Sequence, residues 1–183
     1  MNMYKPRKNP QIALKPQDLV VLLRLSLAKG EMPRYADLAA ELAMTASEVH
    51  AALERAHAAK LVRKERARAP LLLRDALLQF ILHGAPYVFP AVRGEATRGF
   101  ATAYAAPPLR DRIVQPAGEP PPVWPHPEGN VRGVALYPLY PSVPEAARKN
   151  AALYELLALF DALRAGAARE RKMASDLLSE RLA

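Results

Sequence analysis

Three polar side chains within one short segment, Ser47, His50 and Arg55, are suited to hydrogen bonding with a nucleic acid. Arginine can donate two parallel hydrogen bonds to guanine, and serine can bond to a base or to a phosphate. Ala51 is a further candidate, because residues in the N-terminal half of a recognition helix face the edges of bases. The residue types in this segment therefore predict contact with the edges of bases.

A compact cluster of cations follows at Arg63, Lys64, Arg66 and Arg68. Such a cluster can neutralise phosphates, and each released counterion adds about 0.9 to the dependence of log affinity on log salt. Residues 1–68 hold 13 Lys and Arg against 7 Asp and Glu, whereas the rest of the chain holds 13 against 11. Most of the net charge of +8 therefore lies in this part and suits a polyanionic partner.

The segment that positions these groups has the pattern of two short helices, at about 34–43 and 46–59, joined by a tight turn. Thr45 and Glu48 have the spacing of a capping box, which would open the second helix. This layout predicts a helix-turn-helix, in which the second helix enters the DNA major groove. The small or apolar residues that support it are Leu38, Ala39, Leu42, Met44, Val49 and Ala52.

The alternative for the second helix is an ordinary solvated face. Glu48 and Glu54 favour that alternative because carboxylates are repelled by phosphates, although Glu48 also has its capping role. The candidates for base-edge contact are Ser47, His50, Ala51 and Arg55. The candidates for phosphate contact are Arg34, Thr45, Lys60, Arg63, Lys64, Arg66 and Arg68.

The flanking elements extend this pattern. The helix expected from Asp18 to Ala28 is apolar almost all round, which is typical of a core helix. Residues 60–63 predict a short strand, and the basic turn follows it. Three helices, a strand and a basic turn in this order resemble a winged-helix domain. The pattern Ala-Leu-Glu-Arg-Ala, followed by Lys-Leu-Val at 60–62, looks like that of MarR-type bacterial regulators. The resemblance covers about residues 16–68 and implies a winged fold that binds a DNA groove.

The middle of the chain is rich in proline, with 13 of the 18 prolines between Pro86 and Pro144. A helix is expected from Pro70 to about Gly84. Short strands are expected at about 98–104 and 131–137, and an exposed polyproline segment at 118–127. The aromatic residues of this region, Trp124 among them, are interpreted mainly as packing, with a groove for a peptide or small ligand as the alternative.

Helical spacing returns at 145–165 and at about 167–182. The leucine stripe of the first of these helices could form a dimer seam or pack on the chain's own core. The fold class is thus mainly α with a few short strands. Its parts are a basic arm over 1–15, a winged helix-turn-helix domain over 16–68, a helix and proline-rich α+β segment over 69–144, and C-terminal helices over 145–183.

Signatures of an enzyme are missing from the sequence. Gly94 and Gly99 have the outer spacing of a phosphate-binding loop, but Phe100 and Ala101 replace the Lys-Ser/Thr pair that this loop requires. His126 with Glu128 is a weak metal motif. We therefore expect no catalysis, no cofactor and no metal. The chain has no cysteine, and we expect a cytoplasmic protein without a membrane segment.

These observations predict a sequence-specific regulator of transcription that binds double-stranded DNA, with a homodimer as one arrangement. An alternative is an antitoxin-like or accessory subunit that binds a protein partner through its C-terminal part and autoregulates through DNA binding. A third hypothesis is a winged helix that binds structured RNA.

Overall fold

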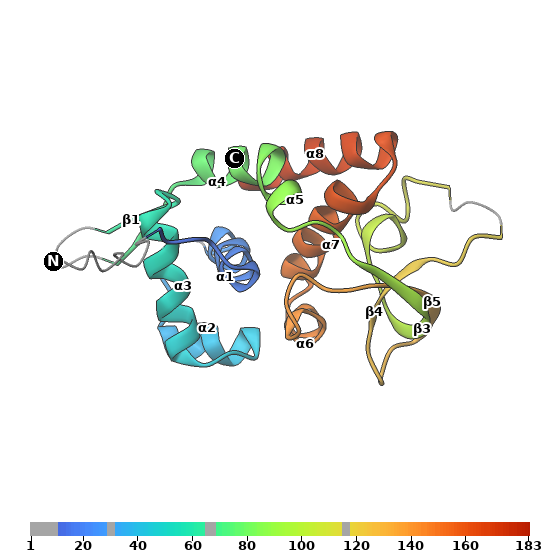
Figure 1. The fold of residues 1–183 in the computed structure, drawn as a ribbon, viewed down its shortest axis with the longest axis horizontal. Coiled ribbons are helices and arrows are strands. Elements are labelled where there is room, and N and C mark those ends of the chain that lie inside the picture. Colours follow the sequence, from blue (N-terminus) through green and yellow to red (C-terminus); the bar gives the residue numbers. More distant parts are fainter. Residues whose placement is uncertain (1–10, 29–31, 65–68, 115–117) are drawn as a thin grey trace, which may run out of the picture.

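The computed structural model describes residues 11–28, 32–64, 69–114 and 118–183. The chain is mainly helical with a few short strands, as predicted. Figure 1 shows the helices of the first part of the chain at one end of the molecule and a group of later strands at the other. We call the elements from α1 to β2 the N-terminal unit and those from α4 to α8 the C-terminal unit.

The N-terminal unit is built on α1 (Pro16–Ser26), which is buried on almost every side, as its apolar sequence predicts. The helix starts at Pro16, and the Lys15 backbone N–H donates a 2.8 Å hydrogen bond to the Asp18 carboxylate. Helices α2 (Tyr35–Leu42) and α3 (Ala46–Ala58) pack against it. The core of this unit therefore forms around α1.

The turn between α2 and α3 is tight. Ala43 adopts a left-handed conformation with φ 50° and ψ 46°, and the Met44 N–H donates to the Ala39 carbonyl at 2.9 Å. Thr45 and Glu48 form the predicted capping box: the Glu48 N–H donates to Thr45 Oγ1 at 3.2 Å, and the Thr45 N–H donates to Glu48 Oε2 at 2.8 Å. The turn thus fixes the angle at which α3 leaves α2.

A two-stranded hairpin follows α3. Strand β1 (Val62–Arg63) pairs antiparallel with β2 (Leu71–Leu72). The prediction of a strand at 60–63 is confirmed in its second half, whereas Leu71 and Leu72 were expected in a helix that instead begins later, as α4 (Arg74–His83). The hairpin extends the N-terminal unit beyond the predicted boundary at residue 68.

The C-terminal unit contains three strands that close into a small barrel. Strand β3 (Arg93–Ala101) pairs antiparallel with β4 (Pro122–Pro125) and with β5 (Val131–Leu136), while β4 and β5 pair in parallel. The backbones approach so closely that a Cβ at Gly99 would lie 1.9 Å from the Trp124 carbonyl oxygen. Glycine is therefore required at this crossing.

Two predictions for the proline-rich region are corrected here. Strand β3 starts at Arg93, earlier than expected, and ends at Ala101, before a 3-10 turn, η1 (Ala103–Ala105). Residues 122–125 were expected in an exposed polyproline segment, but Val123 and Trp124 are fully buried in β4. Prolines occupy only the two ends of this strand, where missing backbone donors cost least.

The helices of the C-terminal unit are α4, α5 (Ala85–Val88), α6 (Val143–Lys149), α7 (Ala151–Ala165) and α8 (Ala168–Leu182). They link the barrel to the N-terminal unit, since α7 contacts both η1 and α1. The helix expected at 145–165 is interrupted at Asn150, whose side chain caps α7 by accepting from the Leu153 N–H at 3.0 Å. The leucine stripe of α7 is buried within the chain's own core. Within the described ranges, no helix is both long and apolar enough to cross a membrane.

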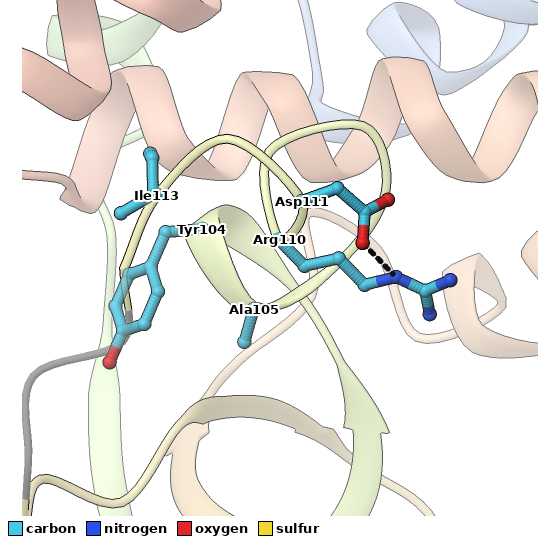
Figure 2. A pocket seen from close by; sticks show the side chains of 5 residues that line it. All are labelled: Tyr104, Ala105, Arg110, Asp111 and Ile113. Atoms are coloured by element: carbon cyan, nitrogen blue, oxygen red, sulfur yellow. Dashed lines mark ion pairs between the residues drawn. The ribbon is translucent and has the colours of Figure 1, made fainter.

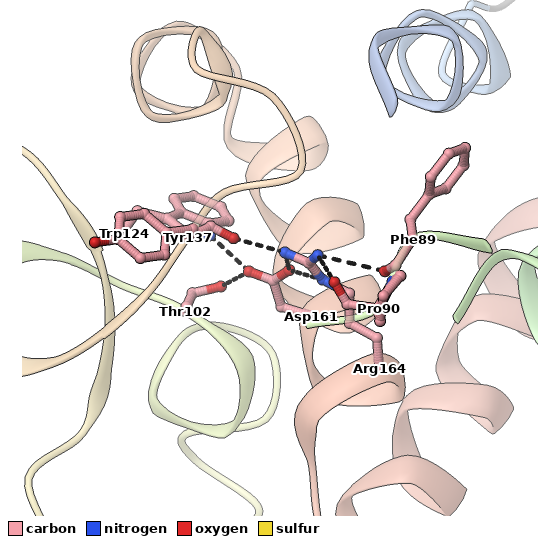
Figure 3. A network of polar contacts seen from close by, with 7 residues as sticks. All are labelled: Phe89, Pro90, Thr102, Trp124, Tyr137, Asp161 and Arg164. Carbon is pink, nitrogen blue, oxygen red and sulfur yellow. Dashed lines mark hydrogen bonds and ion pairs between the residues drawn. The ribbon is translucent and has the colours of Figure 1, made fainter. Parts of the chain in front are cut away.

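A buried polar network attaches the barrel to α7 (Figure 3). The Asp161 carboxylate accepts from Thr102 Oγ1 at 2.7 Å, from Trp124 Nε1 at 2.6 Å and from Arg164 Nε at 2.8 Å. Arg164 in turn donates to the Tyr137 carbonyl at 2.8 Å. Burial raises the pKa of Asp161, and the Arg164 charge opposes this effect. Every donor in the network points to an acceptor, as a stable buried charge pair requires.

Candidate nucleic-acid interface

The outward face of α3 carries three of the predicted base-edge residues. Ser47 and His50 are exposed, and Ala51 beside them is partly exposed. Helical geometry brings Ser47, His50, Ala51 and Glu54 onto this face because they are three or four residues apart. The face therefore carries a serine hydroxyl and an imidazole, which can donate or accept hydrogen bonds, and a carboxylate, which accepts them.

Arg55 does not belong to that face. Its Nε and Nη2 atoms donate to the two oxygens of the Asp18 carboxylate at 2.8 and 2.6 Å, and Asp18 is completely buried. The hydrogen bond to Asp18 is the main cause of a raised pKa of Arg55. The Arg55 side chain is 17% exposed. This geometry contradicts the prediction that Arg55 reads bases, because its donors are used to hold α3 against the start of α1.

The phosphate candidates have different surroundings. Arg34, at the N-cap of α2, and Lys60, just after α3, are exposed, and Lys60 has a left-handed backbone with φ 59°. Arg63 is exposed at the end of β1. Lys64 forms an ion pair with Glu54, which lowers the pKa of that carboxyl. Thr45 is exposed at the start of α3, while Arg66 and Arg68 lie outside the described residues.

The Glu48 carboxylate, which would repel a phosphate, is occupied by internal donors. Its Oε2 accepts from the Thr45 N–H and hydroxyl, and its Oε1 accepts from the Tyr140 hydroxyl at 2.7 Å. These hydrogen bonds, led by that of the Thr45 backbone, lower the pKa of Glu48 below its usual value of 4.5. The sequence pattern predicted the contact with Thr45 but not that with Tyr140, which is 92 residues away.

A separate polar cluster surrounds His126. The Nε2 atom of His126 lies 2.8 Å from Glu145 Oε1, and its Nδ1 accepts from the Glu128 N–H at 3.1 Å. The Nε2 atom therefore joins the β4–β5 connection to α6, whereas the Nδ1 atom holds the turn within that connection. Among the residues that the structure describes, no group of three or more His, Asp or Glu side chains could hold a metal ion.

A small pocket of about 250 Å³ lies beside η1 and the turn after it (Figure 2). Arg110 and Asp111 form one part of its lining and are joined by a 3.5 Å ion pair. Tyr104 and Ile113 line another part. The pocket has no nucleophile next to a general base, and its residues do not overlap the face of α3.

No family model describes this chain, and no curated protein or solved structure matches it.

Proposed function

We propose that the chain is a sequence-specific regulator of transcription that binds double-stranded DNA. The observation that carries this proposal is the α2–turn–α3 arrangement, in which a short rigid turn presents Ser47 and His50 on one exposed helix face. A helix of this kind fits the major groove, and the hairpin that follows it resembles the wing of a winged-helix domain. If the protein dimerises, two-fold-related half-sites are expected.

Because Arg55 is paired with Asp18, the contacts with bases must come from the other residues on the exposed face of α3. Ser47 and His50 can bond to base edges, and the Ala51 methyl group can contact the methyl group of thymine. Two exposed cations, Arg34 before α2 and Lys60 after α3, are the proposed phosphate contacts. Sequence specificity would then depend on the base contacts of Ser47, His50 and Ala51. Overall affinity would depend on the phosphate contacts of Arg34 and Lys60.

The proposal is tested by measuring binding to the gene's own upstream DNA and to a random duplex while salt is titrated. We expect the upstream DNA to bind about 10³-fold more tightly or better at physiological salt. Equal affinity for both duplexes would indicate a generic cationic protein. Tighter binding to structured RNA than to either duplex would favour the RNA hypothesis.

The double variant Ser47→Ala with His50→Ala is expected to weaken binding to the specific duplex by about tenfold or more, because losing the readout of one base pair costs about 1–3 kcal/mol. Binding to random duplex should change little. The matched control removes the same side-chain types elsewhere, as His83→Ala with Ser179→Ala on α4 and α8. An equal loss in both double variants would contradict reading by α3.

The double variant Arg34→Ala with Lys60→Ala is expected to weaken binding to all duplexes to a similar extent. The slope of log affinity against log salt should fall by about 0.9 for each cation removed. Arg112→Ala with Arg169→Ala is the control, because both residues are exposed arginines of the C-terminal unit. An unchanged slope in the first variant would exclude Arg34 and Lys60 from phosphate contact.

The second candidate function is an antitoxin-like or accessory subunit that binds a protein partner through the C-terminal unit. It is favoured by large apolar side chains that are at least half exposed there, among them Tyr87 at 83%, Val92 at 55% and Tyr137 at 50%. Val92 and Tyr137 are neighbours, because the Tyr137 N–H donates to the Val92 carbonyl at 2.9 Å. A stoichiometric partner that co-purifies with the native protein and is lost on Tyr137→Ser would favour this candidate.

A further inference from the structure

Two polar contacts from the C-terminal unit lie on either side of the α2–α3 turn. Tyr140, in the segment before α6, donates its hydroxyl to Glu48 in the first turn of α3. Lys149, at the end of α6, donates from Nζ to the Ala40 carbonyl near the end of α2 at 2.9 Å. One contact therefore fixes the helix that enters the turn, and the other fixes the helix that leaves it.

The Tyr140 contact acts on the residue that caps α3. Glu48 uses one carboxylate oxygen for Thr45 and the other for Tyr140, so the tyrosine restricts the orientation of the whole carboxylate. A hydroxyl that donates to an ionised carboxylate forms one of the stronger hydrogen bonds in proteins. The contact also raises the pKa of Tyr140 itself.

The Lys149 contact reinforces the same geometry. Carbonyls in the last turn of a helix have no partner within the helix, and a cation there also interacts favourably with the helix dipole. Helix α6 packs on α2, so the lysine extends an existing contact between the two units. The segment from Tyr140 to Lys149 is thus attached to both α2 and α3, while α6 also packs on α7 of the C-terminal unit.

We propose that Tyr140 and Lys149 are positioning residues that hold the α2–α3 turn and set the orientation of α3, so that the C-terminal unit controls the DNA-reading helix. The proposal rests on the proposed function for its effect on DNA. Its effect on the turn itself is independent of any ligand. A partner or ligand that displaces the segment 140–149 would release the turn and change DNA affinity without touching α3.

The primary test is Tyr140→Phe, which removes only the hydroxyl. Hydrogen exchange of the Thr45 and Glu48 amides should become about tenfold faster, since a hydrogen bond to a charged group is stronger than one between neutral groups. The control is Tyr154→Phe, which removes a hydroxyl that donates to the Ala101 carbonyl within the C-terminal unit at 2.5 Å. Because amides at a turn exchange by local opening, this control should leave their exchange unchanged even if it lowers overall stability.

The pH dependence gives a second readout. Because the native pKa of Glu48 is lowered, its capping contribution is present above pH 4.5 and is lost as pH falls through that lowered pKa. In Tyr140→Phe the pKa of Glu48, followed by NMR titration, should rise toward 4.5. An unchanged pKa of Glu48 together with unchanged exchange at the turn would overturn the proposal.

DNA binding separates this proposal from the proposed function. Tyr140→Phe and Lys149→Met should each lower affinity for the specific duplex by about threefold to tenfold. Lys172→Met, which removes a lysine paired with Asp176 on the surface of α8, should have no effect. If the wild-type protein binds no duplex while exchange at the turn still responds to Tyr140→Phe, the proposed function fails and the positioning role stands. If the wild type binds DNA but neither variant changes affinity or exchange, the positioning role fails alone.

Discussion

Arg55→Ala is expected to destabilise the protein by about 3–5 kcal/mol, a large part of the stability of a typical domain. The substitution leaves the Asp18 carboxylate completely buried without the guanidinium that neutralises it. It also removes the two hydrogen bonds that hold α3 to the start of α1. Urea unfolding followed by circular dichroism measures the loss.

The control for this variant is Arg181→Ala. Arg181 also forms an arginine–carboxylate pair, with Glu155 at 2.7 Å, but both side chains are about one third exposed. Such a pair contributes about 1 kcal/mol or less. An Arg55→Ala protein that keeps the stability of the wild type and loses only specific DNA affinity would show that Arg55 reads bases after all.

Asp161→Ala is expected to lower the free energy of unfolding by a similar ~3–5 kcal/mol or to prevent the C-terminal unit from folding. The Arg164 side chain is 4% exposed and would keep its charge without a carboxylate, while the Thr102 and Trp124 donors would lose their acceptor. Trp124 is the only tryptophan in the chain, so its fluorescence reports directly on this site.

Two further variants test the cause of that loss. Asp176→Ala removes an exposed carboxylate of α8 and should change stability by less than about 1 kcal/mol. Asp161→Asn keeps an oxygen acceptor but removes the charge, and its stability should fall between those of the wild type and Asp161→Ala. If all three variants have wild-type stability, the network does not hold the barrel to α7.

The helices could be predicted from the sequence because their signals are local. Helical spacing of apolar residues indicated α3 and α8 to within one residue at most boundaries, and the pair of Thr45 and Glu48 indicated where α3 begins. The break at Asn150 was missed because the apolar spacing continues through it. The side chain of Asn150 nevertheless carried a signal, since asparagine is among the preferred N-cap residues.

Contacts between distant parts of the chain could not be predicted in this way. Strand β4 is short, contains prolines at both ends and is defined by pairing with β3 and β5, which no local pattern encodes. Arg55 was predicted at the interface because it lies on α3, as expected. The direction of its side chain, however, is set by the Asp18 carboxylate in α1. Asp18 accepts a hydrogen bond at the start of its own helix, whereas its contact with Arg55 joins residues 37 positions apart, which no local pattern indicates.

The apolar core continues from α1 to α8 without a boundary between the units. Contacts of α1 with α7 and of α2 with α6 connect the two units. A fragment that stops after the hairpin would present part of this surface to water at a cost of about 25 cal/mol for each Å². The protein should therefore unfold in a single cooperative transition. A change that destabilises the C-terminal unit would then also lower the free energy of unfolding of the N-terminal unit.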